Sequence, residues 1–351
     1  MPQPLRTRLR RAAIAGRLLC LLCLTTLWLS SAEQAPVVRF AVIGDSGTGE
    51  RPQYQIARQM AAWHERMPFD LVLMLGDNIY GGWLGFSGGN RKYFNEQFDQ
   101  PYADLLRRRV IFRAALGNHD LGTHNGQDLI DAHGRFHIDG PLGYYRFTAG
   151  EWHPHAAGAP HAGGGERPAP LVEFFVLNTN RMIEGKQDPE QLAWLEKALA
   201  SSRAQWRIVY GHHPIYSSGR RHGGDEGLRA MLEPILTKPT DASESSPRVQ
   251  IYLAGHDHIY QRLRPQKCVV HFVCGAGGQL RKGNARPSPQ VAAGEDQQRV
   301  FMLWEATRDE LRFRAISEEG KAFDCGVVRE GGLVKSFACT SSAESLPSRS
   351  E

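Results

Sequence analysis

Five short polar blocks in this 351-residue chain carry residue types that can bind metal ions or transfer protons. Each block begins with glycine and directly follows an apolar run; the blocks are residues 44–45, 76–80, 117–120, 211–214 and 255–258. A single Gly-Asp or Gly-Asn-His-Asp is usually only a turn or a helix cap. In the last block, Gly-His-Asp-His, the two imidazoles can reach one site, because residues i and i+2 of an extended segment point the same way. Five such blocks in series predict a shared site.

Together the blocks supply seven potential metal ligands: Asp45, Asp77, Tyr80, Asn118, His212, His256 and His258. Carboxylate and imidazole ligands suit first-row transition metals. Seven ligands exceed the four of a tetrahedral zinc site, and they suit two ions that share one bridging carboxylate. The phenolate of Tyr80 is a hard anionic ligand, which stabilises a trivalent ion better than a divalent one.

The stretch VIGDSGTG (42–49) also allows a different chemistry, in which Ser46 is the nucleophile of an esterase. That mechanism needs a histidine and an aspartate late in the chain, typically as Asp-x-x-His, and no such element follows. The late histidines come instead as Gly-His-Asp-His. Asp45 is therefore the functional residue of this stretch, and Ser46 is expected to fill the turn.

Alternating strands and helices are predicted to position the blocks. Apolar runs predict strands at 37–43, 70–75, 110–116, 171–178, 205–210 and 249–254, and amphipathic patterns predict helices at 54–66, near 189–201 and at 225–238. Further strands are expected at 269–273, 299–307, 310–317 and 325–328, whereas 150–170, 239–248 and 281–298 are expected to be loops. In α/β sheets ligands bind at the carboxyl ends of strands, where the five blocks lie.

The sequence before and within the helix near 189–201 has the residues that are typical of a helix N-terminus. Asp188 is the expected N-cap, Pro189 occupies the first helical position, and Gln191 completes a capping box. The whole pattern predicts an α/β fold with a mixed sheet system and an all-β closing section.

The series GDSG, GDNIY, GNHD, VYGHHP and GHDH resembles the metallophosphoesterase superfamily, and the tyrosine of GDNIY resembles the purple acid phosphatases. The order and length of the segments are similar to the small, tartrate-resistant type. The resemblance runs over about 37–317 and includes PLGYYRF and CGAGG. It implies a metallophosphoesterase-type sandwich of two mixed β-sheets flanked by helices.

The resemblance also implies a role for each residue. Fe(III) would be held by Asp45, Tyr80 and His258, and a divalent ion (Fe, Zn or Mn) by Asn118, His212 and His256, with Asp77 bridging the two ions. His119 would protonate the leaving group. His222 lies near the place of a substrate-side histidine of the family but is offset by one residue, and His213 receives no role.

The implied reaction is hydrolysis of phosphate monoesters by attack of a metal-bound hydroxide, as in an acid phosphatase. Ions of +3 and +2, with two carboxylates, one phenolate and one hydroxide, leave a net charge of about +1, which attracts a phosphate anion. A phosphodiesterase of the same superfamily, acting on nucleotides or lipid headgroups, is the alternative. A binding protein without catalysis is disfavoured because all seven ligands are present.

Residues 1–32 predict an export signal. This stretch has five arginines and no acidic residue, then an apolar run at 18–29 and the small residues Ser-Ser-Ala. An uncleaved membrane anchor is the second interpretation. Cleavage would give a periplasmic or secreted product with 37 basic and 37 acidic residues. A net charge of zero disfavours nucleic-acid binding. The expected organisation is a signal peptide at 1–32, a phosphoesterase domain at 33–340 and a disordered tail at 341–351. The expected substrates are small phosphorylated molecules, and no membrane span is expected after cleavage.

Four cysteines remain after the signal. Cys268 and Cys274 flank a predicted strand and would lie roughly 20 Å apart, too far to form a disulfide with each other. Pairing of these two with Cys325 and Cys339 is the expectation, and free thiols are the alternative. The histidines of 150–170 (His153, His155 and His161) are expected to belong to a flexible surface insertion that could reshape the rim of the site, and metal binding by them is the alternative.

Overall fold

A computed structural model describes residues 36–80, 90–122, 126–132, 134–150, 169–239 and 248–339. The predicted signal segment and tail, the loop at 240–247 and nearly all of the 150–170 insertion lie outside the described residues. Within the described parts, the structure shows no helix that is both long enough and apolar enough to span a membrane.

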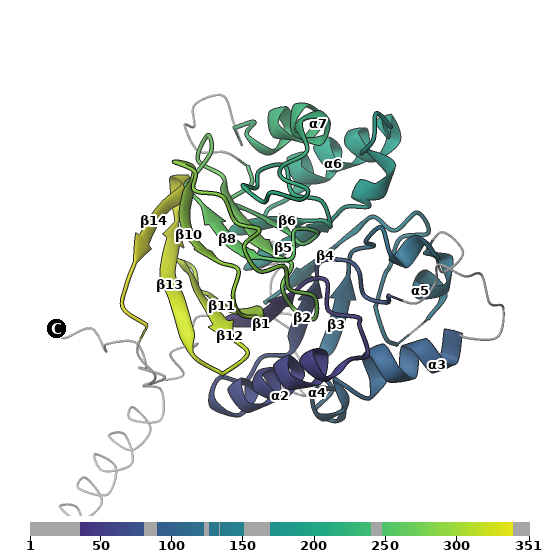
Figure 1. Ribbon diagram of the computed structural model, residues 1–351. Coiled ribbons are helices and arrows are strands. Elements are labelled where there is room, and N and C mark those ends of the chain that lie inside the picture. Colours follow the sequence, from purple (N-terminus) through teal and green to yellow (C-terminus); the bar gives the residue numbers. More distant parts are fainter. Residues whose placement is uncertain are drawn as a thin grey trace, which may run out of the picture. The chain divides into compact units, whose positions relative to one another are not determined.

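Two seven-stranded sheets form the fold (Figure 1). The first, sheet A, has the order β14 (Leu333–Ser336), β13 (Ala322–Arg329), β12 (Leu311–Ser317), β11 (Val300–Ala306), β1 (Val38–Ile43), β2 (Leu71–Met74) and β3 (Ile111–Ala114). The second, sheet B, has the order β10 (Val291–Glu295), β8 (Tyr260–Leu263), β9 (Val270–Cys274), β7 (Ile251–Ala254), β6 (Trp206–Tyr210), β5 (Val172–Val176) and β4 (Tyr145–Ala149). Strands β1, β2 and β3 run parallel, as do β5, β6, β7 and β9, and antiparallel strands complete each sheet.

Aromatic side chains join the two sheets. The Phe40 ring of sheet A packs edge-on against Phe174 of sheet B, with centroids 5.2 Å apart. Phe272 of sheet B packs against both Trp304 and Phe313 of sheet A, at 5.1 Å in each case. All five rings are buried, and edge-to-face pairs of this kind add stability beyond the burial of their area.

Helices cover the outer faces of the sheets (Figure 1). Helix α2 (Arg51–Arg66) packs Ile56, Met60 and Trp63 into the core of sheet A, beside α4 (Ala103–Arg107). Helices α6 (Pro189–Ser201) and α7 (Glu226–Leu236) form a second apolar cluster with β5, β6 and β7. The short α3 (Asn90–Phe94), a π-helical turn (Asn95–Asp99) and α5 (Gln127–Asp131) complete the sheet A side. The predicted sandwich of mixed sheets with flanking helices is confirmed.

Several boundaries differ from the prediction. Helix α2 begins at Arg51, so Pro52 lies in its first turn, where no intrahelical N–H is required. The segment 281–298 was expected to be a loop and contains β10, which pairs antiparallel with β8. Asp188 caps α6 as predicted, accepting from the Gln191 N–H at 3.1 Å. The Gln191 side chain completes no reciprocal bond to the Asp188 N–H; it binds the backbone of Asn178 at 2.9 and 3.2 Å.

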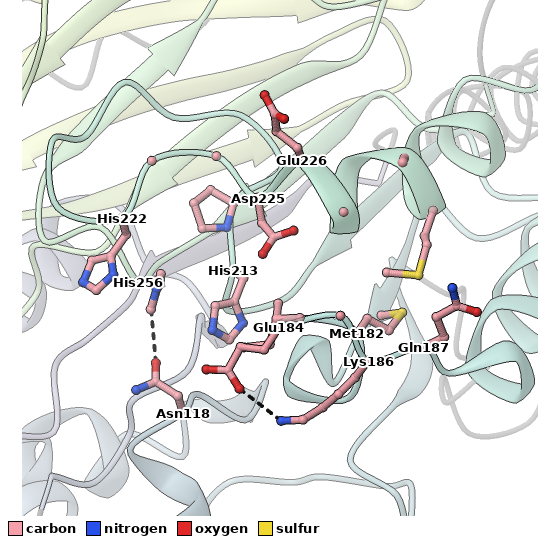
Figure 2. Close-up of a pocket in the computed structure, with 18 of the residues that line it drawn as sticks. Asn118, Met182, Glu184, Lys186, Gln187, His213, His222, Asp225, Glu226 and His256 are labelled. Atoms are coloured by element: carbon pink, nitrogen blue, oxygen red, sulfur yellow. Dashed lines mark hydrogen bonds and ion pairs between the residues drawn. The ribbon is translucent and has the colours of Figure 1, made fainter.

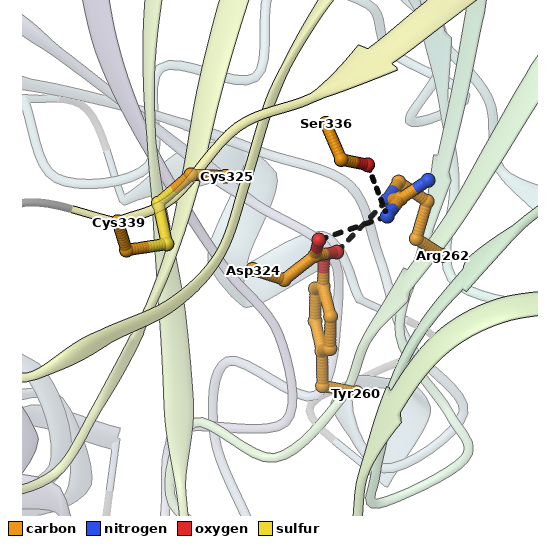
Figure 3. The surroundings of a disulfide bond; sticks show 6 residues. All are labelled: Tyr260, Arg262, Asp324, Cys325, Ser336 and Cys339. Atoms are coloured by element: carbon orange, nitrogen blue, oxygen red, sulfur yellow. Dashed lines mark hydrogen bonds and ion pairs between the residues drawn. A yellow bond between two sulfur atoms is a disulfide. The ribbon is translucent and has the colours of Figure 1, made fainter.

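The expected pairing of Cys268 and Cys274 with Cys325 and Cys339 was wrong, and the alternative, that some thiols stay free, is confirmed. Cys325 of β13 bonds to Cys339, with Cα atoms 5.5 Å apart (Figure 3). Cys268 and Cys274 are free thiols. Strand β14 returns antiparallel to β13, and the Phe337 N–H donates to the Cys325 carbonyl at 3.0 Å. The hairpin therefore brings Cys339 beside Cys325. Cys274 is instead buried on β9, where its thiol lies 3.8 Å from the Val300 carbonyl oxygen.

Candidate metal centre

All five polar blocks lie at carboxyl ends of parallel strands. The blocks after β1, β2 and β3 leave sheet A at one edge, and those after β6 and β7 leave sheet B. Backbone hydrogen bonds tie neighbouring turns together: the Asp45 N–H donates to the Gly76 carbonyl at 3.0 Å, and the Gly255 N–H donates to the His212 carbonyl at 2.9 Å. The five blocks therefore converge where the two parallel groups of strands meet.

One set of three ligand atoms comes from Asp45, Tyr80 and His258. The Tyr80 hydroxyl oxygen lies 3.4 Å from Asp45 Oδ1 and 3.4 Å from His258 Nε2, and the latter two atoms are 3.5 Å apart. Ligands bound at about 2.1 Å to one ion are separated by roughly 3 Å or more. We name these three residues the tyrosine triad.

A second set comes from Asn118, His212 and His256, which we name the histidine triad. Asn118 Oδ1 lies 3.0 Å from His212 Nε2 and 3.1 Å from His256 Nδ1, and the two nitrogens are 3.2 Å apart. The opposite ring nitrogen of His212, Nδ1, lies 2.9 Å from the Leu75 carbonyl oxygen. That carbonyl accepts the Nδ1 proton, so Nε2 presents a lone pair to the triad.

Asp77 lies between the two triads. Its Oδ1 is 3.5 Å from His212 Nε2, and its carboxylate also interacts with the Tyr80 hydroxyl. The same Oδ1 accepts the backbone N–H of His119 at 2.8 Å. Asp77 is 1% exposed. A buried carboxylate that faces both sets of ligands is placed to bridge them.

The backbone at the site adopts rare conformations. Asp45, Asp77 and His256 have φ values of 53°, 50° and 68°, in the left-handed region that non-glycine residues seldom occupy. Such strain persists only where the surrounding structure imposes it, and it is concentrated at functional sites. Gly76, with φ of 91°, allows the close approach: a Cβ there would lie 2.5 Å from His212 Nδ1.

Burial makes the charged forms of these side chains costly without a cation. Burial raises the pKa of Asp45 well above its ordinary value, and the neighbouring Asp77 raises it further against the opposing effect of His212. Burial, with Asp45 and Asp77 next, likewise raises the pKa of Tyr80 well above 10.0. Burial lowers the pKa of His256 and of His258. Oxygen and nitrogen ligand atoms that converge in a buried pocket fit metal ions, which would stabilise the ionised forms of Asp45 and Tyr80.

Three further histidines surround the triads. His119 is exposed, and its ring centroid lies 4.5 Å from that of Tyr80. The ring of His222 packs 4.1 Å from that of His256 (Figure 2). His213, which the sequence left without a role, is buried 4.4 Å from the His256 ring, and its Nδ1 lies 2.8 Å from the Thr179 hydroxyl.

Ser46 is buried in the turn that follows β1. It is 1% exposed, and its side chain interacts with the buried Tyr102 hydroxyl. The expectation that Ser46 fills the turn agrees with this placement.

Two buried carboxylates that sequence reasoning missed organise the turns. Asp120 accepts the backbone N–H groups of Gly117, Asn78 and Ile79 at 2.7, 2.9 and 3.0 Å, which joins the second block to the third. Asp257 accepts hydrogen bonds from a separate loop. Their only sequence signal was their position inside the blocks GNHD and GHDH.

A cavity of about 950 Å³ opens beside the histidine triad (Figure 2). Asn118, His256 and His222 line its end at the site, and Lys186 and Met182 lie farther from the triad (Figure 2). Its size suits a ligand larger than phosphate alone.

Comparison with known proteins identifies the class. Residues 38–260 match the Calcineurin-like phosphoesterase family, and the chain belongs to that family. Human tartrate-resistant acid phosphatase type 5 is 29% identical over 282 residues, which cover 73% of this chain and 78% of that protein. Purple acid phosphatase 7 of Arabidopsis thaliana is 26% identical, with 71% and 72% covered. The resemblance predicted from the motifs is confirmed.

Solved structures share the fold. The purple acid phosphatase PPD1 from yellow lupin (Lupinus luteus) seeds has a TM-score of 0.62 at 19% identity, and the match covers 84% of this chain and 54% of that one. The structure titled "GAP50 the anchor in the inner membrane complex of Plasmodium" has a TM-score of 0.63 at 18% identity, with 88% and 90% covered.

Proposed function

We propose that this protein is an exported acid phosphatase that hydrolyses phosphate monoesters at a dinuclear metal centre. The observation that carries the proposal is the pair of triads with Asp77 between them. The sequence similarity to tartrate-resistant and purple acid phosphatases supports the same reaction class.

In this proposal the tyrosine triad holds Fe(III) and the histidine triad holds a divalent ion (Fe, Zn or Mn), with Asp77 as the shared ligand. When bound, the two ions supply Lewis acidity toward a phosphoryl group and lower the pKa of water. The chain supplies the rest. Hydrogen bonds from the His256 N–H to Asp45 Oδ2 and from His212 to Leu75 hold the ligands in place before any ion arrives.

His119 is the proposed general acid. Its backbone N–H is fixed by Asp77 Oδ1, and its exposed imidazole stands beside Tyr80 at the open side of the site. The ring can therefore reach a leaving-group oxygen and give it a proton. Such a proton transfer typically accelerates a reaction by about 10²- to 10⁴-fold.

His222 is proposed to contact the substrate from the other side. It lines the cavity together with His256 and Asn118, so a phosphoryl group at the histidine triad would have His222 as a neighbour (Figure 2). The remaining cavity would receive the organic part of a small phosphorylated substrate.

Export is proposed on the composition of residues 1–32, with cleavage near Glu33 and the phosphoesterase domain at 33–340. The disulfide between Cys325 and Cys339 supports a periplasmic or secreted location, because disulfides persist in oxidising compartments. N-terminal sequencing of the product tests this: residues 1–32 intact on membrane-bound protein would favour the anchor.

Hydrolysis of paired substrates tests the reaction. The wild-type protein should cleave 4-nitrophenyl phosphate with a much higher kcat/KM than bis(4-nitrophenyl) phosphate, and Asp77→Asn should abolish both activities together with metal binding. A preference for the diester would replace the monoesterase with the phosphodiesterase alternative. Absence of both activities in metal-loaded protein would refute the proposal.

A further inference from the structure

Asp257 lies between two proposed ligands, His256 and His258, and its buried carboxylate binds a loop rather than the metal site. Its Oδ2 accepts from the Ser217 hydroxyl at 2.5 Å and from the Gly223 N–H at 3.1 Å. Residues 217–224 form this loop, which carries His222, and we name it the His222 loop. We propose that Asp257 is a positioning residue that fastens the His222 loop to the metal-ligand turn. The inference rests on the proposed function of the site.

The neighbouring segments complete this anchor. Asn284 Nδ2 donates to Asp257 Oδ1 at 3.3 Å, while Asn284 Oδ1 accepts the Arg221 N–H at 2.9 Å and the Asn284 carbonyl accepts the Arg220 N–H at 2.8 Å. Gln261 Oε1 accepts the Ser218 N–H at 3.0 Å. Asp257, Asn284 and Gln261 are all buried. The loop therefore takes its shape from three buried side chains that accept its N–H groups.

Gly219 shows how closely the loop approaches the carboxylate. A Cβ at this position would collide with all three carboxylate atoms of Asp257. The backbone of the loop thus lies directly on the Asp257 side chain. Loss of this contact should loosen the loop, which Asn284 and Gln261 also hold.

The consequence concerns His222. Its imidazole is exposed, so its place beside His256 follows from the loop backbone rather than from burial of the ring. Asp257 lies in the same turn as His256 of the histidine triad and His258 of the tyrosine triad. One residue therefore links the geometry of both triads to the position of the proposed substrate histidine.

The test compares four proteins: wild type, Asp257→Asn, His222→Ala and the double variant. Asp257→Asn keeps the side-chain volume but replaces one acceptor oxygen with an NH₂ group, so at least one of the hydrogen bonds that Asp257 accepts from Ser217, Gly223 and Asn284 is lost. It should lower kcat/KM about 10-fold to 100-fold. Whichever of kcat and KM changes in His222→Ala should also be the one that changes in Asp257→Asn. The double variant should be no worse than His222→Ala alone, because Asp257 acts through His222.

Hydrogen exchange supplies a readout that does not depend on activity. In Asp257→Asn, the amides of Arg220, Arg221 and Gly223 should exchange about 10-fold faster or more than in the wild type. Metal content should stay at the wild-type value. Asp324→Asn is the matched control: this buried carboxylate pairs with Arg262 and Tyr260 (Figure 3), so its loss should change neither KM nor exchange in the His222 loop.

Additive effects of the two substitutions, loss of metal from Asp257→Asn, or unchanged exchange in the loop would each overturn the inference. If the wild-type protein hydrolyses no phosphate ester, the proposed function fails, and the exchange measurement still decides whether Asp257 holds the loop.

Discussion

At the scale of single residues, the seven potential ligands named from the sequence lie in one buried site. Residue type and position after a strand were enough to predict that these side chains converge, because the carboxyl ends of parallel strands lie at the same edge of a sheet. The spacing of the residues could not reveal that six of them form two triads with Asp77 between, because each triad combines side chains from both sheets. Nor could it reveal Asp120 and Asp257, whose roles arise from backbone N–H groups of distant segments.

The first residue-scale prediction concerns His119. The substitution His119→Ala should preserve metal content, because the ring belongs to neither triad. It should slow hydrolysis of esters with poor leaving groups by about 10²-fold or more and of esters with good leaving groups much less. Steady-state kinetics with a series of aryl and alkyl phosphates measures this. Equal slowing across the series would show that His119 is not the general acid.

At the scale of elements, strands with long apolar runs were predicted well, and four strands were missed: the edge strands β4, β10 and β14 and the buried inner strand β8. Strand β10 has the sequence Val-Ala-Ala-Gly-Glu and alternates between partial burial and exposure, so it carries little apolar signal. It forms because β8 supplies hydrogen-bonding partners along its edge. Strand β14, which is also largely exposed, forms in the same way against β13. Such strands depend on hydrogen bonds to a neighbouring strand, and the residues of the strand itself carry little signal for them.

The disulfide at the edge of sheet A gives an element-scale prediction. Cys339→Ser removes a cross-link between residues 14 apart, which should lower the free energy of unfolding by up to about 3 kcal/mol. Metal content and KM should be unchanged, because neither cysteine belongs to the triads. Chemical denaturation measures the loss. Cys268→Ser, which alters a free thiol, is the control and should cost less; an equal cost in both variants would contradict the assignment.

At the scale of the whole molecule, the site exists only when the sandwich is closed. Asp45, Asp77, Tyr80 and Asn118 come from turns of sheet A, and His212, His256 and His258 come from turns of sheet B. The ring contacts Phe40–Phe174 and Phe272–Trp304 hold the two sheets against each other. Metal ions that bind both groups of ligands should therefore stabilise the folded protein by mass action.

Acid stability is predicted from His271, a buried residue of β9 that packs against Tyr216 and Tyr252. Burial lowers its pKa from 6.5 to about 3, despite the opposing effect of Glu233. At a pH between these two pKa values, His271 binds a proton in the unfolded chain but not in the folded protein. The free energy of unfolding should therefore fall as pH drops from about 6.5 toward 3, by roughly 1.4 kcal/mol per pH unit at most.

Substitution tests this dependence. His271→Phe keeps an aromatic ring in the core and removes the titrating group, so the decline between pH 6.5 and 3 should be shallower than in the wild type. Denaturation at several pH values measures it, with pH 7.5 as the reference where His271 contributes no charge. An unchanged slope in the variant would show that other groups determine the acid response.

The most direct test of the dinuclear centre is elemental analysis of the purified protein together with its visible spectrum, in the wild type and in Tyr80→Phe. Two metal ions per chain, at least one of them iron, should accompany a purple or pink charge-transfer band. In Tyr80→Phe, which removes only the phenolic oxygen, the band should vanish and the trivalent ion should be easier to reduce or lose, while the fold is retained. A colourless, iron-free but active wild-type protein that carries only divalent ions would contradict the assignment of Fe(III) to the tyrosine triad.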